Sequence, residues 1–526
     1  MKKIIIYVML SLVLVILGQA QVVYEPLDQS IYAFLQRTYV RGLHNENLEV
    51  IPLDRTRIAE CLYRIRQSDS ELSANDKEEL EFYERDLFHE LRALRIVHEK
   101  DSNTWHLYQY ADTILYLTLD PILGANIKKN AVHRFSGAKL YGQLGNVIGY
   151  TFHFTENAEF GTRIDKSKKN IPSTGINLYS QPNINSIEYS DIRAAIGVKW
   201  GWGCFSLGKD YINWGMGQRS KLILSSKAPS FPFLRLDLRP TEWLRFYYLH
   251  GWLQSDVLDS ISTYDAKIPS KKRNIFRPKY IAAHFVSVSL LKNLNISFGE
   301  SIIYSDMPPN LLFLNPILFY RAVDHYLTTN SNNDDGNNSQ IFLNADFRVF
   351  NSLELFGSLF IDEIRTTAIF NEDKSRNQLG YSLGIIYNSQ LLSDATFTAE
   401  YTRILPWVYS HYIQTQTYES DGYLLGHYIG QNSDQIYLKV DYRIISQLQI
   451  GFFYDYIRKG GLEDIHFQYV LPSLPFLYGT VTRNTIYGMN LLYEPIHDMR
   501  FGVQGFYENK DNEKYGVELQ VSYGLF

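Results

Sequence analysis

From about residue 103 to the end of the chain, apolar and polar residues alternate with a period of two. The last segment shows it best: Tyr515, Val517, Leu519, Val521, Tyr523 and Leu525 alternate with Gly516, Glu518, Gln520, Ser522 and Gly524. The same pattern runs through 343–349, 379–385 and 436–444. Runs of about ten residues, apolar on one side and polar or small on the other, are typical of transmembrane β-barrels.

A sheet in lipid must close, because every backbone N–H and C=O needs a partner inside the sheet. We count about 16 to 18 alternating runs, and 18 is the preferred number, with long loops alternating with short turns. The long loops are expected at 164–186, 212–230, 256–279, 306–338, 405–433 and 459–483. The sequence therefore predicts an all-β membrane protein, an outer-membrane antiparallel β-barrel over residues 103–526.

Residues 21–102 have helical periodicity and predict a small periplasmic α-helical domain. One helix carries Ile31, Leu35 and Tyr39 on one face, and Gly42 ends it. A second begins after the N-cap Asp54. A third begins after Ser73, which precedes Asp76 as in a capping box. Its apolar stripe is expected to continue as one helix through Leu80, Tyr83, Leu87, Leu91 and Leu94.

The first twenty residues resemble a secretory signal peptide. Lys2 and Lys3 precede an apolar run over 4–17, and Gly18-Gln19-Ala20 supplies a small-residue cleavage site. A single membrane anchor is the alternative, but the apolar run is short for a membrane span. We expect residues 1–20 to be removed and the mature chain to leave the cytoplasm.

Composition is consistent with this picture. The chain has 40 Tyr, 30 Phe and 7 Trp but 2 Cys, and its formal net charge is −5. A polytopic helical membrane protein is excluded because it needs repeated apolar runs of about 20 residues. Neither part of the mature chain is basic, so we expect no nucleic-acid partner. Tyrosine and phenylalanine instead suit the lipid-facing side and the interfacial belts of a barrel.

Charged residues of both signs fall on the inward side of the predicted strands: Asp346, Arg348, Glu354, Asp362, Glu400, Lys439, Asp441 and Arg443. They either line a water-filled path or cross-link the walls and inserted loops into a plug. We prefer the second interpretation, but the pattern leaves both open.

No catalytic constellation emerges, and we expect neither an enzyme nor a bound metal or cofactor. Gly380-Tyr381-Ser382-Leu383-Gly384 matches G-x-S-x-G, but that motif needs a strand-to-helix turn and here lies within a strand. The histidines lack metal-binding spacing, and His284 is expected at the membrane interface. The tract 330–339 is expected to be a solvated loop. A disulfide between Cys61 and Cys204 stays open.

One glycine- and tryptophan-rich segment departs from plain alternation. Indoles beside charged groups suit sugars, which present C–H faces for stacking and hydroxyls for hydrogen bonds. An aromatic girdle with a structural loop is the alternative. The candidate carbohydrate-binding residues are Trp200, Trp202, Lys209, Asp210, Trp214 and Arg219.

Several motifs, in the same order, resemble the Wzi-type capsule assembly proteins. They include Pro52-Leu53-Asp54-Arg55, Gly208-Lys209-Asp210 with Trp214-Gly215, Leu314-Asn315-Pro316, and Glu400-Tyr401-Thr402-Arg403. The resemblance implies an 18-stranded barrel with a periplasmic helical bundle. It also implies a lectin-like anchor for capsular polysaccharide at the cell surface, without assigning ligand residues.

We therefore predict a non-enzymatic protein of the bacterial outer membrane that binds, anchors or assembles capsular or other surface polysaccharide. An outer-membrane pore is the alternative, and a hydrolase using Ser382 is a third hypothesis. The expected partners are that polysaccharide, outer-membrane lipid, and the outer-membrane assembly machinery, which reads a terminal aromatic such as Phe526. Phe526 has the opposite parity to the apolar set, so this cue is partial. The glycan, the state of the lumen and the oligomeric state stay undetermined.

Overall fold

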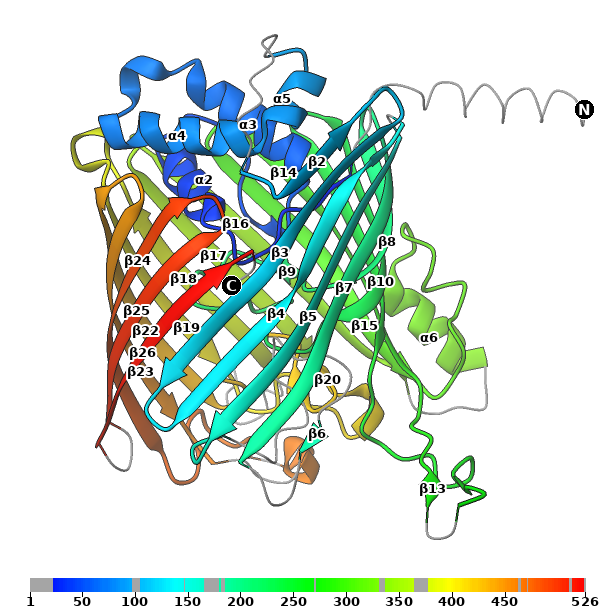
Figure 1. The fold of residues 1–526 in the computed structure, drawn as a ribbon. Coiled ribbons are helices and arrows are strands. Elements are labelled where there is room, and N and C mark those ends of the chain that lie inside the picture. Colours follow the sequence, from blue (N-terminus) through cyan, green and yellow to red (C-terminus); the bar gives the residue numbers. More distant parts are fainter. Residues whose placement is uncertain are drawn as a thin grey trace, which may run out of the picture.

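The computed structural model describes residues 22–96, 105–145, 147–164, 179–180, 185–268, 271–330, 336–363, 377–461, 465–470, 472–509 and 513–524. Within these residues, 18 antiparallel strands close into a barrel (Figure 1), which confirms the predicted architecture. β26 pairs with β3 and closes the sheet, with Leu519 opposite Ile127.

The barrel strands are β3 (Leu115–Lys128), β4 (Ala131–Leu144), β5 (Ile148–Gly161), β7 (Ser186–Trp200), β8 (Gly203–Asp210), β10 (Phe231–Thr241), β11 (Leu244–Leu253), β14 (Lys279–Leu291), β15 (Leu294–Ser305), β16 (Asn338–Val349), β17 (Leu353–Glu363), β18 (Gln378–Tyr387), β19 (Ala395–Ile404), β22 (Ser433–Ile445), β23 (Leu448–Lys459), β24 (Thr482–Ile496), β25 (Met499–Asn509) and β26 (Glu513–Tyr523). Short strands pair beside them or in the loops: β1 (Val50–Ile51), β2 (Tyr108–Ala111), β6 (Tyr179–Ser180), β9 (Asn213–Trp214), β12 (Tyr264–Asp265), β13 (Lys272–Arg273), β20 (Glu419–Ser420) and β21 (Tyr423–Leu424).

The predicted alternation is confirmed on the strands. Leu343, Leu383 and Ile385 point outward and are exposed, whereas Asn344 and Ser382 on the same strands point inward and are buried. Outward apolar side chains on consecutive strands form the surface that faces lipid.

The two ends of the barrel differ in their connections. At one end, the loop end, the predicted long loops occupy 211–230, 254–278, 306–337, 405–432 and 460–481. The other, the turn end, has short connections such as 201–202 and 242–243. No helix in the described part of the chain is long and apolar enough to cross a membrane.

Helices cover the turn end, and one of them enters the barrel mouth (Figure 1). They are α2 (Ile31–Val40), α3 (Arg55–Arg66), α4 (Ala74–Asp86) and α5 (Phe88–Ala93). Asp54 caps α3 by accepting from Thr56 N–H, and Ser73 and Asp76 form the predicted capping box of α4. We call residues 22–96 the helical plug.

The prediction of a single helix over the stripe from Leu80 to Leu94 is wrong, because the chain breaks at Leu87 into α4 and α5. Arg55 Nη2 donates to the Asp86 carbonyl at 3.0 Å. This carbonyl is the one that would accept from residue 90 in a continuous helix. A tertiary contact therefore replaces a helical hydrogen bond.

A further departure lies on the lipid-facing wall. His284 and Glu300 sit opposite each other on β14 and β15, point outward and pair at 3.3 Å. Helix α6 (Tyr320–Asn330), from the 306–337 loop, lies outside the barrel beside them (Figure 1). Tyr320 N–H donates to Glu300 at 2.6 Å, and the Tyr320 ring lies over His284. His284 is therefore covered on the outer face of the wall by a loop, and its place at the membrane interface stays a prediction.

Four sequence expectations lie partly or wholly outside the described residues. These are the signal peptide, the terminal Phe526, most of the long loop at 164–186 and half of the 330–339 tract. The domain boundaries at 20/21 and 102/103 stay predictions. Cys61 and Cys204 are both buried and unpaired; Cys61 lies in the core of the helical plug, and Cys204 lies on the barrel wall beside Tyr24.

Candidate functional site

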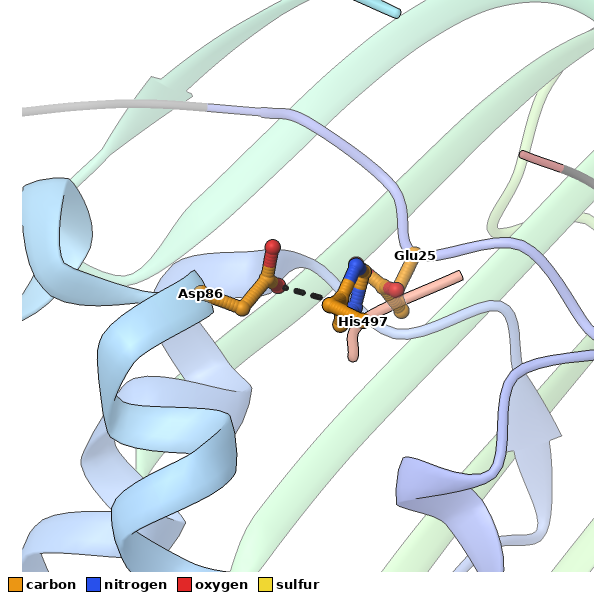
Figure 2. A group of neighbouring side chains, drawn as sticks. All are labelled: Glu25, Asp86 and His497. Carbon is orange, nitrogen blue, oxygen red and sulfur yellow. Dashed lines mark ion pairs between the residues drawn. The ribbon is translucent and has the colours of Figure 1, made fainter. Parts of the chain in front are cut away.

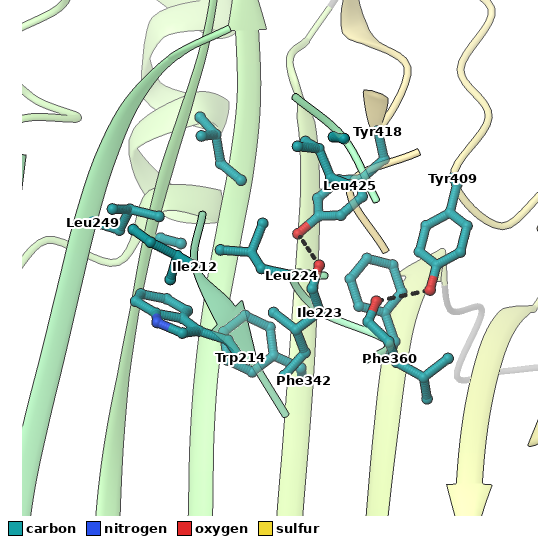
Figure 3. Packing of buried hydrophobic residues seen from close by; sticks show 14 of the residues in the cluster. Ile212, Trp214, Ile223, Leu224, Leu249, Phe342, Phe360, Tyr409, Tyr418 and Leu425 are labelled. Carbon is teal, nitrogen blue, oxygen red and sulfur yellow. Dashed lines mark hydrogen bonds between the residues drawn. The ribbon is translucent and has the colours of Figure 1, made fainter. Parts of the chain in front are cut away.

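Two long loops, 211–230 and 405–432, turn back from the loop end into the barrel. Together they form an apolar core against the inward faces of the wall (Figure 3). Trp214 is 0% exposed and meets Phe285 edge-on, with ring centroids 5.0 Å apart. Tyr409 and Tyr418 donate to the carbonyls of Leu222 and Ile223 at 2.7 and 3.0 Å. We call these two loops the loop plug.

The two plugs meet inside the barrel. Strand β1 of the helical plug pairs with β9 of the loop plug, with Val50 opposite Trp214. Gly215 N–H donates to the Glu49 carbonyl at 2.9 Å, and Gly215 has a φ of +120°, which disfavours residues with a side chain. The lumen is therefore crossed by a continuous protein seam.

Several of the inward charged residues hold these plugs in place. Of the two roles that the sequence left open, these residues cross-link the wall and the inserted segments. Glu400 accepts from the backbone N–H groups of Gln218 and Arg219 at 2.7 and 3.0 Å. Asp362 accepts from Tyr409 N–H at 2.7 Å. Asp346, Arg348, Glu354 and Arg443 bond to the helical plug. Lys439 and Asp441 pair with each other on the wall at 2.7 Å.

A buried ionic network inside the helical plug reaches the turn end of the barrel through His497. Arg55 contacts Glu25, Asp86 and Glu90 at 2.6, 2.9 and 2.8 Å. His497, in the turn between β24 and β25, points at Asp86 at 3.4 Å (Figure 2). Glu25, Asp86 and His497 are spaced closely enough to hold a metal ion. Because Arg55 already supplies a compensating charge, we assign them to the ionic network.

Burial and charge shift the pKa values in this network in opposite directions. Burial would raise the pKa of Asp86, but Arg55, His497 and His106 together lower it to about 2. Burial would lower the pKa of His497, but Asp498 and Asp86 raise it to about 9. Both groups are therefore charged at neutral pH, as an ion pair requires.

The six candidate carbohydrate-binding residues do not lie together. Trp200 and Trp202 lie at the turn end. Lys209, which donates to Ile192 O and Ser230 at 2.8 and 2.7 Å, and Asp210 lie near the loop end of β8. Trp214 is enclosed in the loop plug and has no face left for a sugar ring.

Arg219 is the candidate with the most suitable surroundings. Its guanidinium lies 5.5, 5.2 and 5.6 Å from the ring centres of Tyr428, Tyr437 and Phe453. It donates to Asp455 at 2.9 Å, yet its side chain is 34% exposed. Lys227, also exposed, lies 5.8 Å from the Tyr428 ring. We call Gln218, Arg219, Lys227 and Tyr428 the lumen patch.

Sequence reasoning missed Tyr428 and Lys227, because their role depends on the two loops meeting. Tyr437 and Asp455 were detectable in part, since they occupy inward positions on alternating strands. Their neighbour Arg219 comes from a loop, which alternation does not place.

Ser382 lies within β18 and donates to Glu400 at 2.7 Å. It accepts from Thr402 at 3.1 Å. The strand-to-helix turn of a nucleophile elbow is absent at this described position, as predicted. The geometry supports a structural hydrogen bond in the wall.

Comparison with known proteins gives a consistent result. The family model described as "Capsule assembly protein Wzi" matches residues 180–504. Among curated proteins, no sequence matches this chain. The fold is similar to that of Wzi of Escherichia coli, whose structure is titled as an outer membrane protein involved in group 1 capsule assembly and a carbohydrate-binding β-barrel. The TM-score is 0.58 at 12% identity, covering 96% of this chain and 99% of that one.

Weaker similarity extends to outer-membrane proteins of Pseudomonas aeruginosa. OprD has a TM-score of 0.41 at 12% identity, covering 78% of this chain and 92% of its own. OpdK, solved with vanillate, has a TM-score of 0.44 at 10% identity, covering 77% and 98%.

Proposed function

Because this chain belongs to the Wzi family of capsule assembly proteins, we propose that it binds and anchors surface polysaccharide at the bacterial outer membrane, without catalysing a reaction. The closed barrel with its outward apolar side chains suits that membrane and contact with its lipid. The outer-membrane assembly machinery is the partner that such a barrel needs for insertion. Short turns face the periplasm in such barrels, so the loop end faces outward.

The observation that carries the proposal is the lumen patch, held in place by two loops folded into the barrel. Tyr428 offers a ring for sugar C–H groups, while Arg219 and Gln218 offer donors for hydroxyl or carboxylate oxygens. The apolar core beneath them fixes these loops, so little ordering is left for binding. Rigid, partly exposed aromatic and cationic groups are suited to holding a polymer without reacting with it.

The test compares capsule retained on cells with capsule released into the medium. Deleting the protein is expected to shift capsule from cells to medium, and the unaltered chain restores retention. Lys227→Ala and Arg219→Lys are expected to weaken binding of purified capsule about tenfold, the loss of about 1.4 kcal/mol of contact. Arg219→Lys keeps a charge beside buried Asp455 while removing the planar fork.

Arg277→Ala is the matched control, since Arg277 lies on another loop and pairs with exposed Asp306. It is expected to leave retention and binding unchanged. Retention that survives deletion of the whole protein contradicts the anchoring role.

A transport pore is the second candidate function. One observation favours it: Gln504 on β25 points inward yet is exposed, so that side of the lumen is less filled. Planar-bilayer recordings of the purified protein separate the two functions. Steady channels support transport, and their absence supports an anchor.

A further inference from the structure

A second surface lies on the outside of the barrel, on the sector formed by β14 and β15. Two of the long loops, 254–278 and 306–337, leave the barrel on this side (Figure 1). They are tied together at the rim, where Arg277 pairs with Asp306 at 3.1 Å. Asp306 N–H also donates to the Pro278 carbonyl at 3.0 Å. The two loops therefore share the outer side of the barrel, away from both plugs.

The 254–278 loop folds into a hairpin that projects beyond the loop end (Figure 1). β12 and β13 pair within it, with Asp265 opposite Lys272. Nearer its base, Leu258 and Phe276 form an isolated bridge between the two arms. The hairpin is therefore held by its own backbone pairing, and its tip stands away from the barrel wall.

The tip of this hairpin is basic and exposed. Four exposed cations and one exposed acid lie there: Lys267, Lys271, Lys272 and Arg273, with Asp265. None of the four cations forms an ion pair within the part of the chain that the structure describes. The other acids of the loop, Asp256 and Asp259, lie near its base. The tip therefore carries an excess of accessible positive charge, which attracts an anionic partner.

The 306–337 loop lies closer to the turn end than the hairpin, against the outer wall. Tyr320 N–H donates to Glu300 near the middle of β15, which fixes the start of α6 at the level of the strands. Just before α6, Ile317 and Phe319 are 86% and 50% exposed. Because the strands span the membrane, apolar side chains exposed on their outer side contact lipid chains.

This sector therefore has apolar side chains at the level of the strands and basic side chains beyond the loop end. The same order describes a lipid of the outer leaflet, whose acyl chains lie in the membrane and whose phosphate groups lie at its outer surface. Clusters of Lys and Arg beside a membrane are typical sites for anionic headgroups. A soluble acidic glycan matches the hairpin but not the apolar segment.

We propose that this outer sector binds a phosphate-bearing glycolipid of the outer leaflet. Its phosphate groups accept from Lys271, Lys272 and Arg273, and its acyl chains lie against Ile317 and Phe319. The proposal deepens the lipid contact stated above and rests on that part of the proposed function, but not on polysaccharide binding. It gives the anchor a second attachment to the cell surface, separate from the lumen patch.

The test measures lipid binding by native mass spectrometry of the purified full chain in a neutral detergent. The probe is diphosphoryl lipid A, and the matched lipid is monophosphoryl lipid A, which has the same acyl chains and one phosphate fewer. We expect the diphosphoryl lipid to bind about tenfold more tightly. Lys271→Gln, Lys272→Gln and Arg273→Gln together are expected to weaken it about a hundredfold, from about fivefold for each cation.

Lys129→Gln, Arg163→Gln and Lys514→Gln together are the matched control. These cations are also exposed at the loop end, but they lie beside β3, β5 and β26, and their removal changes the net charge equally. We expect them to weaken binding less than about threefold, because salt screens distant exposed charges. A loss as large as that of the hairpin variant, or equal binding of the two lipids, overturns the proposal.

Ile317→Ser tests the contact with the acyl chains. It is expected to weaken both lipids by about tenfold and to keep their ratio, because the two lipids have the same chains. The control is Leu391→Ser, since Leu391 is 94% exposed on the turn between β18 and β19, at the other end of the barrel. If the two serine variants behave alike, the acyl contact is absent and the proposal is overturned.

A competition experiment separates lipid from soluble glycan. Polygalacturonate has carboxylates but no acyl chains, and we expect diphosphoryl lipid A to stay bound in its presence. If the polymer displaces the lipid, and the hairpin variant no longer binds the polymer, the hairpin recognises a glycan and the proposal is overturned.

Failure of this proposal is distinguishable from failure of the proposed function. Capsule lost on deletion of the protein, together with lipid binding that ignores the hairpin substitutions, rejects the lipid site alone. Capsule unaffected by deletion, together with lipid binding that depends on the hairpin, rejects anchoring alone.

Discussion

The helical plug and the loop plug fill the same barrel by different physical means. Charges hold the helical plug together and attach it to the barrel: within the plug Arg55 contacts three carboxylates, and from the barrel Arg443 reaches Asp76 at 2.6 Å and His497 reaches Asp86 at 3.4 Å. The loop plug is attached mainly through apolar packing around Trp214, Phe342 and Phe360. At the seam, the strands β1 and β9 join the two.

The difference follows from which wall residues each plug meets. Near the turn end the inward wall is charged, so a polar helical surface docks there by ion pairing. Nearer the loop end the inward wall of β10, β14, β16 and β17 is apolar at Phe233, Phe285, Phe342 and Phe360. A buried charge destabilises the fold when its partner loses its own charge, whereas an apolar contact is weakened when packed volume is removed. The helical plug is therefore expected to be sensitive to pH, and the loop plug to be insensitive.

The largest expected effect is on the helical plug, from Arg55→Met. The change leaves Glu25, Asp86 and Glu90 buried without their shared cation, and breaking buried pairs costs about 3–5 kcal/mol. The native Cys61 thiol, buried in this plug, reports its opening. We expect its labelling rate to rise by roughly three orders of magnitude.

Arg66→Met is the control for that substitution. Arg66 pairs with Glu84 on the exposed side of the helices. Exposed pairs contribute about 0–1 kcal/mol, so labelling is expected to change less than tenfold. Equal labelling rates for the two variants contradict a plug that is held closed by the buried network around Arg55.

The second effect is on the loop plug, from Trp214→Ala. Removing a fully buried indole costs about 3–5 kcal/mol through lost burial and the cavity left behind. Hydrogen exchange of peptides from 211–230 is expected to accelerate, because the Trp214–Leu224 backbone bonds open more often. Cys61 labelling is expected to change far less. Exchange as slow as in the unaltered chain contradicts an apolar anchor.

The barrel and the helix caps could be predicted from the sequence, but the burial of Trp214 could not. The strands, their alternation and the long loops were predictable, because a membrane barrel imposes a period of two and a regular order of connections. Asp54 and Ser73 were predictable caps, because capping is local. The burial of Trp214 was not predictable, since it depends on β1 pairing with a loop distant in sequence.

The same reason explains the other differences. The break at Leu87 requires Arg55 to bond the Asp86 carbonyl, and the outward pair His284–Glu300 requires α6 to cover it. Both are contacts between elements that are distant in sequence, and the periodicity within an element does not predict them. The residue type of Arg219 indicated a binding role from the sequence. Its contacts with Tyr428 and Tyr437 could not be predicted, because they form only where the two loops and the wall meet.

A third, smaller effect tests the comparison by pH. The pKa of His497 is raised to about 9, so its stabilising charge is complete below about 6.5 and is lost as pH rises towards 9. The pKa of Asp86 is lowered to about 2, so its contribution is lost as pH falls from about 4 towards 2. Cys61 labelling, corrected for the intrinsic rate of a free thiol, is expected to be slowest between about pH 4 and 6.5.

His497→Gln is expected to remove the alkaline rise and keep the acidic one. Hydrogen exchange in the loop plug, corrected for the intrinsic rate of a free amide, is expected not to change over this pH range. If Cys61 labelling and hydrogen exchange in the loop plug both rise at alkaline pH, the two plugs are not held by different kinds of interaction.

The smallest effect is expected from Ser73→Ala, which removes a local contact from the helical plug. Ser73 accepts from Asp76 N–H at 3.1 Å, and its loss costs about 1 kcal/mol of helix stability. Cys61 labelling is expected to rise about fivefold, because Asp76 keeps its ion pairs with Arg41 and Arg443. Ser68→Ala, just outside a short 3-10 turn and without a side-chain cap, is the control. A rise as large as that of Arg55→Met means that one local helix cap matters as much as the buried ionic network, and the charge-based description of this plug is then wrong.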